Sequence, residues 1–283
     1  MNHYGLSTED FIRYALDEDT GDGDHTSLST IEADSFSTAR VMAKEDGIIA
    51  GIDVAIEVLK KVDPLIGYDT FQKDGARVQK GNPILNVKGN TRSLLKAERL
   101  LLNCMQRMSG IATLTRAFVD AIEGTGAIVL DTRKTTPNFR QFEKLAVRLG
   151  GGQNHRTGLY DMILIKDNHV DAAGGIKPAI EKANVYLNKT GKNLKIEIET
   201  RNLTEVMEVM SIGKVNRIMF DNFTPQFMKE AVEMIDGRFE TEASGGINLE
   251  TIRSFAETGV NYISVGALTH SYRSLDISMK IQK

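Results

Sequence analysis

The sequence predicts an α/β protein in which about six parallel strands form an incomplete, open α/β barrel. Three observations predict this class. From residue 127 onward, strand-like runs alternate with helical patterns, as in consecutive βα units. Six successive runs are each followed by polar residues or glycines, which suits a barrel, where strand ends meet at one active site, better than a doubly wound sheet with a single switch point. Only about six strands can be identified, fewer than the eight of a complete barrel.

The first part of the chain has a different pattern. Residues 7–17 predict a helix that begins at Ser7 or Thr8, and an acidic turn follows over residues 18–26. Alternating residues then predict short antiparallel strands with one helical segment among them. The expected strands cover 37–43, 47–52 and 77–88, and the helical segment covers about 53–61.

A long apolar-periodic helix is expected from Thr91 or Ser93 to Met108. Ser109 and Gly110 are expected to interrupt it, before a second helix that ends near Ile122. We place the domain boundary at this interruption.

Two domains follow from that boundary. The N-terminal domain covers residues 1–109, and the last residues, 273–283, are expected to pack back on it. The barrel covers residues 110–272.

The barrel region supplies six strand-like runs. They are Ala127–Leu130, Met162–Ile165, Leu194–Ile198, Arg217–Phe220, Arg238–Glu242 and Tyr262–Val265. Helical patterns lie at about 139–148, 177–189, 203–211, 225–235 and 249–257.

Composition narrows the class of ligand. The net charge of −3 and the pI near 6.0 give no sign of nucleic-acid or membrane binding. Residues 131–170 nevertheless hold seven Lys or Arg against four acids, which indicates a small anionic ligand. The single cysteine, Cys104, excludes an intrachain disulfide and is expected to be a buried thiol in a reduced, cytoplasmic protein.

Two glycine loops follow the last two predicted strands: Ser244-Gly245-Gly246 and Gly266-Ala267. Barrels commonly bind phosphate there through backbone N–H groups, which glycine lets approach closely. Each loop alone is more typical of a simple turn. Together, after adjacent strands, they favour a phosphate site.

Cations gather earlier in the barrel. Arg133 and Lys134 follow the first strand, and His155 and Arg156 end a loop that begins with three glycines. The planar guanidinium matches carboxylates and phosphates with two parallel hydrogen bonds. We interpret this group as an anion site.

Lys166, Glu199 and Asp221 each end a predicted strand. Lys166 could form a Schiff base, bind phosphate or pair with a carboxylate. The two acids could bind sugar hydroxyls, hold a divalent cation or stabilise developing positive charge. Glu197 points to the same side of the strand as Glu199 but lies one step deeper, so it is a weaker candidate for these roles.

Common catalytic motifs do not occur. There is no Walker A sequence, no dinucleotide-binding glycine motif after a strand and no nucleophile elbow. His169 and His270 lack metal-ligand spacing and are interpreted as hydrogen-bonding or structural residues.

The chain resembles the quinolinate phosphoribosyltransferase family in an ordered set of motifs. They are Glu18-Asp with Gly23-Asp-His-Thr26, Ala97-Glu-Arg99 with Asn103, Ser109-Gly-Ile-Ala-Thr113, Asp131-Thr-Arg-Lys-Thr135, Gly150-Gly-Gly-Gln-Asn-His-Arg156, Leu164-Ile-Lys-Asp-Asn-His169, Phe220-Asp-Asn222, Ser244-Gly-Gly246 and Val265-Gly-Ala-Leu-Thr-His270. The resemblance implies an N-terminal α/β sandwich domain beside the incomplete barrel, and transfer of phosphoribosyl from phosphoribosyl pyrophosphate to quinolinate with decarboxylation.

The resemblance also implies residue roles. The carboxylates of quinolinate would be held by Arg133, Lys134, His155 and Arg156, with Thr132 beside them. Lys166 would face the ribosyl and pyrophosphate side, Glu199 and Asp221 the ribose with Mg²⁺, and the two glycine loops the 5′-phosphate. Catalysis would rest on Lys134, Lys166, Glu199 and Asp221.

The resemblance further implies a homodimer, and hexameric assembly of such units is compatible with it. Arg99, which by its own pattern is a solvated helix residue, would cross into the site of the partner subunit.

Three other functions compete with this one. A paralogue of the family that is found with molybdate-transport genes shares the fold, although the pair Arg133 and Arg156 favours a dicarboxylate. A Schiff-base aldolase would use Lys166 but leaves the arginines unexplained. A non-catalytic binding protein would not need both acids together with Lys166.

Overall fold

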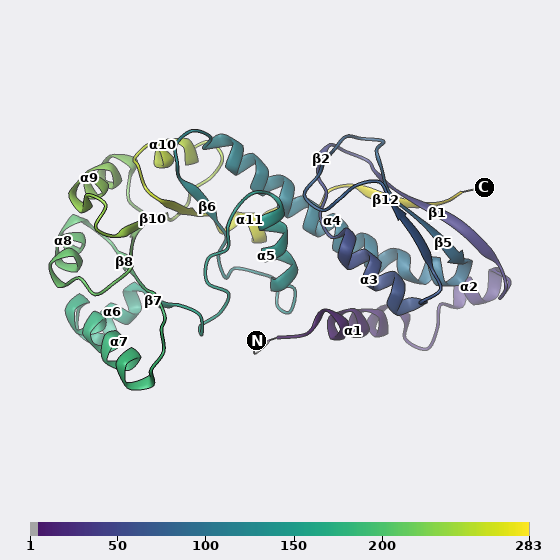
Figure 1. The fold of residues 1–283 in the computed structure, drawn as a ribbon, viewed down its shortest axis with the longest axis horizontal. Helices are drawn as coiled ribbons and strands as arrows, with labels where there is room; N and C mark the ends of the chain where they lie inside the picture. Colours follow the sequence, from purple (N-terminus) through teal and green to yellow (C-terminus); the bar gives the residue numbers. More distant parts are fainter. Residues whose placement is uncertain (1–4, 283) are drawn as a thin grey trace. The chain divides into compact units, whose positions relative to one another are not determined.

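The computed structural model describes residues 5–282 and divides the chain into two compact units (Figure 1). The first comprises the chain up to residue 116, residues 135–151 and the chain from residue 271, and the second comprises residues 117–134 and 152–270. The boundary predicted between residues 109 and 110 stays a prediction.

The first unit is built on a four-stranded antiparallel sheet in the order β12-β1-β5-β3. The C-terminal strand β12 pairs with β1, so the last residues join a sheet formed by the first part of the chain. The elements of this unit are α1 (Thr8–Thr20), α2 (His25–Thr30), β1 (Phe36–Ala43), β2 (Gly47–Ile48), α3 (Ile52–Val62), β3 (Gly67–Thr70), β4 (Arg77–Val78), β5 (Pro83–Asn90), α5 (Arg140–Leu149) and β12 (Ile277–Gln282).

Several predicted elements of this unit are confirmed. Helix α1 begins after Ser7, whose side chain accepts a hydrogen bond from the backbone N–H of Asp10. Strand β1 and helix α3 match their predicted ranges to within a residue. Cys104 is buried, and burial raises the pKa of its thiol to about 12.

The predicted break at Ser109 and Gly110 is wrong. Helix α4 (Thr91–Ala121) runs through both residues without interruption. The Ser109 hydroxyl accepts a hydrogen bond from Ala50 N and donates to Ala50 O, and a Cβ at Gly110 would clash with the carbonyl oxygen of Arg273. Both small residues therefore serve close packing around the helix, which glycine permits at a modest cost in helix propensity.

Two predicted strands are also corrected. The stretch 77–88 is divided into β4 and β5 by a turn, in which Asn82 accepts from Gln79 N and Gly81 has φ +92°. The stretch 47–52 is strand only at β2, because Gly51 turns the chain into α3 with φ +96°. Strand β3 and helix α2 carry no clear periodic signal, so the sequence does not predict them.

The second unit is the predicted open barrel. Its six strands are all parallel and lie in the order β6-β11-β10-β9-β8-β7, with β6 and β7 at the two edges. Helices α6 to α10 line the outer side of the curved sheet (Figure 1). The elements are β6 (Ile128–Leu130), β7 (Ile163–Ile165), α6 (Asp167–Ala173), α7 (Ile176–Thr190), β8 (Ile196–Thr200), α8 (Leu203–Ile212), β9 (Arg217–Asp221), α9 (Pro225–Ile235), β10 (Glu240–Ser244), α10 (Ile252–Ala256), β11 (Tyr262–Ser264) and α11 (Ala267–His270).

Within the barrel two strands are shifted from their predicted places. Strands β8 and β10 each begin and end two residues later than expected, so Glu199 lies within β8 and Ser244 is the last residue of β10 rather than part of the loop. The short helices α6 and α11 start shortly after β7 and β11, in the segments interpreted from sequence as loops. No helix among residues 5–282 is both long and apolar enough to cross a membrane.

Candidate active site

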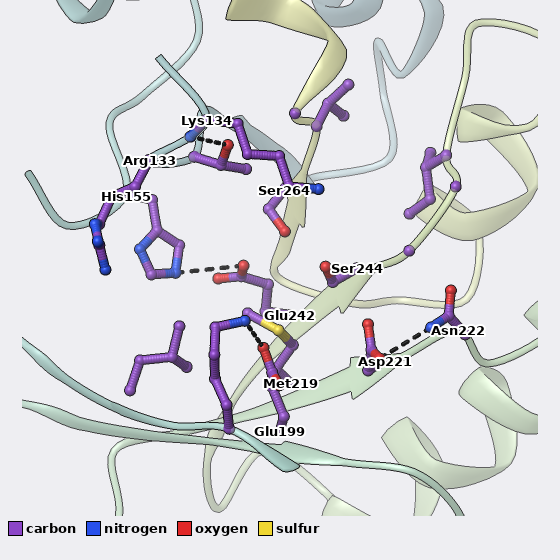
Figure 2. Close-up of a pocket in the computed structure, with 18 of the residues that line it drawn as sticks. Arg133, Lys134, His155, Glu199, Met219, Asp221, Asn222, Glu242, Ser244 and Ser264 are labelled. Atoms are coloured by element: carbon purple, nitrogen blue, oxygen red, sulfur yellow. Dashed lines mark hydrogen bonds and ion pairs between the residues drawn. The ribbon is translucent and has the colours of Figure 1, made fainter. Parts of the chain in front are cut away.

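The carboxyl ends of the barrel strands surround a cavity of about 870 Å³ (Figure 2). Thirteen of the fourteen residues predicted to bind substrate line it. They are Thr132, Arg133, Lys134, His155, Arg156, Lys166, Glu199, Asp221, Ser244, Gly245, Gly246, Gly266 and Ala267. The structure therefore brings together residues from distant parts of the chain, and this is the consequence of a parallel sheet whose strands all end on one side.

The fourteenth residue, Arg99, lies on α4 in the first unit. It lines a different cavity of about 340 Å³, whose wall also includes Asn103 and Arg107. Its side chain is exposed, as its helical pattern indicated.

Lys166 and Glu199 form a close ion pair in the cavity wall. Lys166 directly follows β7, and Glu199 lies on the neighbouring strand β8, with Nζ 2.6 Å from Oε1. His169 fixes the backbone here, since its Nδ1 accepts the N–H of Lys166 at the start of α6. Of the three roles considered for Lys166, the structure shows the pairing with a carboxylate.

Asp221 ends β9 and is held by the residue that follows it. Asn222 donates from Nδ2 to Asp221 Oδ2 at 2.9 Å and has a left-handed backbone with φ +58°. Gly245 comes so close that a Cβ there would clash with Asn222 Oδ1. Gly245 itself has φ +103°, so both its conformation and its surroundings require glycine.

Arg133 and Arg156 bring like charges together. Burial and the nearby Arg133 guanidinium lower the pKa of Arg156. Two guanidinium groups at one wall of a cavity repel one another until an anion lies between them. This arrangement therefore suits a ligand with more than one negative charge.

His155 is held from both sides of its ring. Its Nε2 lies 3.0 Å from Glu197 Oε2 and 3.5 Å from Glu242 Oε1, and its Nδ1 lies 2.7 Å from the backbone nitrogen of Arg156. Burial favours the neutral ring. The two carboxylates outweigh it and raise the pKa of His155 to about 9.

The loop that carries His155 is anchored by a buried acid. Asp131, which follows β6, accepts the backbone N–H of His155 at 2.9 Å and the side-chain amide of Asn154 at 2.5 Å. An ionised carboxylate that accepts several N–H groups fixes a loop firmly. The conformation of this glycine-rich segment is therefore set by the strand beside it.

Sequence reasoning missed part of the cavity wall. The additional lining residues include Met219, Asn222, Glu242, Ser264 and His270. A signal existed for Glu242, because it is two residues before Ser244 on the same strand and side chains alternate with a period of two.

Figure 2 shows two sides of the cavity with different chemistry. Arg133 and His155 lie on one side, and Asp221 and Asn222 lie on the other, with Glu199 and Glu242 between them. Carboxylate oxygens of Glu199 and Asp221, from adjacent strands, are donors of the type that Mg²⁺ prefers.

An open parallel barrel with a cavity of cations, acids and glycine loops at its strand ends defines an α/β barrel enzyme that acts on a small anionic substrate. Two family models identify it further. The model described as "Quinolinate phosphoribosyl transferase, N-terminal domain" matches residues 24–109, and that described as "Quinolinate phosphoribosyl transferase, C-terminal domain" matches residues 111–280. The chain belongs to the quinolinate phosphoribosyltransferase family, which confirms the resemblance seen in its motifs.

Individual relatives agree with this assignment. The chain is 46% identical to "Quinolinate phosphoribosyltransferase [decarboxylating] 2b, mitochondrial" of Nicotiana tabacum, over 99% of this chain and 83% of the relative. It is 43% identical to "Probable nicotinate-nucleotide pyrophosphorylase [carboxylating]" of Bacillus subtilis, over 99% and 95%. The solved structure of NadC from Streptococcus pyogenes superimposes with a TM-score of 0.93 at 38% identity, covering 99% of this chain and 100% of that one.

Proposed function

We propose that this chain catalyses phosphoribosyl transfer from phosphoribosyl pyrophosphate to quinolinate with loss of CO₂. The products are nicotinate mononucleotide and pyrophosphate, and the reaction belongs to NAD biosynthesis. The observation that carries the proposal is the cavity wall itself, which combines two arginines of interacting like charge with the Lys166–Glu199 ion pair. Membership of the family supports the same reaction.

The arginine side suits quinolinate, which carries two adjacent carboxylates. Arg133 and Arg156 each offer a planar fork for one carboxylate, and Lys134 adds a third positive charge. Thr132 Oγ1 accepts the backbone N–H of Lys134 and so holds the turn that presents it. Binding here orients the ring nitrogen toward the sugar.

The other side suits the sugar phosphate. The loops at Gly245-Gly246 and Gly266-Ala267 offer backbone N–H groups to the 5′-phosphate. Lys166 faces the pyrophosphate, and Glu199 and Asp221 face the ribose hydroxyls.

The transfer step breaks one bond and forms another at C1 of the ribose. The bond from C1 to the pyrophosphate oxygen breaks, and its electron pair leaves with pyrophosphate. Positive charge grows on the ribose ring, where the carboxylates of Glu199 and Asp221 stabilise it. Lys166 stabilises the negative charge of the departing pyrophosphate. The lone pair of the quinolinate nitrogen then closes the new bond to C1.

Decarboxylation follows from the charge on that nitrogen. The bond between C2 and its carboxylate breaks, CO₂ departs, and the electron pair stays at C2 beside the cationic nitrogen. A proton is then taken up at C2. Tight binding of both carboxylates would not accelerate this step by itself, so the site must favour the state in which charge has moved toward the nitrogen.

We include Mg²⁺ as the cofactor. Glu199 and Asp221, from adjacent strands, offer carboxylate donors of the type it prefers, and most of its remaining ligands would come from phosphoribosyl pyrophosphate. When bound, it would neutralise the departing pyrophosphate.

We also propose a homodimeric unit in which Arg99 completes the site of the partner subunit. Its support is that Arg99 lies in the other compact unit and does not line the barrel cavity, although it belongs to the shared motif set. Hexameric assembly of such units and a cytoplasmic location remain predictions, and some plant relatives are named mitochondrial or chloroplastic.

Product detection tests the proposal directly. The protein is incubated with quinolinate, phosphoribosyl pyrophosphate and Mg²⁺, and nicotinate mononucleotide is detected by mass. Omission of each reactant and replacement of quinolinate by nicotinate, which lacks the 2-carboxylate, are the controls. Product formation only in the complete mixture supports the proposal, and its absence with folded protein contradicts it.

A further inference from the structure

The floor of the cavity contains a buried ion cluster that the proposed mechanism leaves unexplained. We define it as His155, Glu197, Arg217 and Glu242, all of which are at most 8% exposed. Barrel interiors are usually filled by branched apolar side chains. Buried charges are costly to desolvate, so stability alone is a weak reason to find these four residues in place of apolar ones.

Glu242 connects the two cations of this cluster. One of its oxygens, Oε1, faces His155 Nε2 at 3.5 Å, and the other, Oε2, accepts from Arg217 Nη1 at 2.6 Å. Figure 2 shows Glu242 in the middle of the cavity floor, directed at His155. Glu242 also lines the cavity, whereas Arg217 does not.

Two further residues, Tyr262 and Glu240, hold Arg217 in place. Its guanidinium lies 3.9 Å from the ring centroid of Tyr262 and pairs with Glu240 at 3.1 Å, and Glu240 pairs in turn with Lys195. Ring stacking, together with two hydrogen bonds from Nε and Nη2 to one carboxylate oxygen of Glu240, holds the guanidinium in one orientation. Glu242 is thus held in place by an arginine that cannot turn away.

We propose that Glu242 is a positioning residue for the carboxylate-binding side of the site, acting through His155. Together with Glu197, whose Oε2 lies nearer at 3.0 Å, it fixes the His155 ring, and the backbone of the adjacent Arg156, whose N–H contacts that ring, is fixed with it. The inference rests on the proposed function, because quinolinate is the ligand whose binding it explains.

A metal ion at the cluster is a less suitable explanation. His155, Glu197 and Glu242 could each offer a ligand atom within 4.8 Å of the others. Arg217 already supplies the positive charge that Glu242 requires, and a divalent cation would lie close to that guanidinium.

The role of Glu242 predicts a selective change in KM. Glu242→Gln is expected to raise the KM for quinolinate by about tenfold or more, since hydrogen bonds to charged groups are lost. The KM for phosphoribosyl pyrophosphate should stay within about twofold, and kcat within about threefold. In a His155→Asn background, Glu242→Gln should change the KM for quinolinate by less than about twofold, because the two residues act as one unit.

Glu230→Gln is the control. It makes the same change at an exposed position on α9, outside the cluster, and leaves the contacts of Glu242 and His155 intact. Its kinetic constants should remain close to those of the wild type. If Glu242→Gln does not fold, Glu242→Gln with Arg217→Met removes both charges and is measured instead.

The outcomes separate this inference from the proposed function. A wild type that does not convert quinolinate overturns both. An active wild type with an unchanged quinolinate KM in folded Glu242→Gln overturns only the positioning role. Equal losses for both substrates would show a merely structural role and would overturn it as well.

Discussion

The ammonium group of Lys166 lies 2.6 Å from the Glu199 carboxylate, and the two groups come from neighbouring strands of the open barrel. The opposite charges of the two groups offset one another at the wall of the cavity. The Glu199 side chain is 9% exposed and that of Lys166 is 47% exposed, so the lysine is the partner that a ligand in the cavity can reach.

Removal of this lysine should stop turnover. Lys166→Ala is expected to lower kcat by at least about a hundredfold, because an electrostatic contact to the leaving group is lost. Thermal unfolding should show a folded protein, with Lys177→Ala on α7 as the exposed control with full activity. Normal activity in folded Lys166→Ala would refute the assigned role.

Arg156 should not tolerate lysine. Arg156→Lys keeps the charge but loses the planar fork, so the quinolinate KM should rise by about tenfold or more. The KM for phosphoribosyl pyrophosphate should change little. Steady-state kinetics with each substrate varied in turn measure both values, and equal effects on the two would contradict separate binding sides.

The stability of the protein should depend on the protonation of His155. Because its pKa is raised from 6.5 to about 9 in the folded state, its contribution is complete below about pH 6.5 and is lost as pH rises toward 9. The difference in unfolding free energy between wild type and His155→Asn should therefore shrink from pH 6 to pH 9. Urea unfolding at both pH values measures it, and a constant difference would show that the ring is not charged.

Gly245 should be intolerant of alanine. Its φ of +103° and the close approach of Asn222 Oδ1 both oppose a side chain, and a destabilisation of about 1–3 kcal/mol is expected. Gly237→Ala, also at positive φ but with open space around it, should cost only about 1 kcal/mol. Chemical denaturation compares them, and similar losses would mean that the close approach is unimportant.

Subunit sharing predicts complementation. Arg99→Ala and Lys166→Ala should each be inactive alone, and a refolded equal mixture should recover about one quarter of wild-type activity, because half of the dimers carry one intact site of two. An Arg99→Ala protein with full activity, or a mixture that stays inactive, would contradict a shared site.

The barrel was predictable from sequence because its signals are local. Most of the strands that follow one another with helices between them are short, largely apolar runs, and several end at a recognisable group such as Lys166 or Asp221. A parallel sheet then gathers these groups on one side whatever the details of packing. Thirteen of the fourteen predicted binding residues lie in one cavity for this reason.

Packing decided what the local patterns could not show. Ser109 and Gly110 look like a helix break, yet they lie inside α4 because neighbouring backbone approaches them there. The alternation of residues 77–88 concealed the turn between β4 and β5. A serine or glycine in the sequence looks the same whether it ends a helix or allows a close contact within one.

The sequence by itself therefore determined the barrel, its family and the ring of charged groups at the strand ends, because these depend on short-range periodicity and on motif order. Only the tertiary structure decided which groups pair: Lys166 with Glu199, and His155 with Glu197 and Glu242. Pairing depends on distances of a few ångströms between separate strands. At those distances two carboxylates raise the pKa of His155 despite its burial, and Glu242 becomes part of the site.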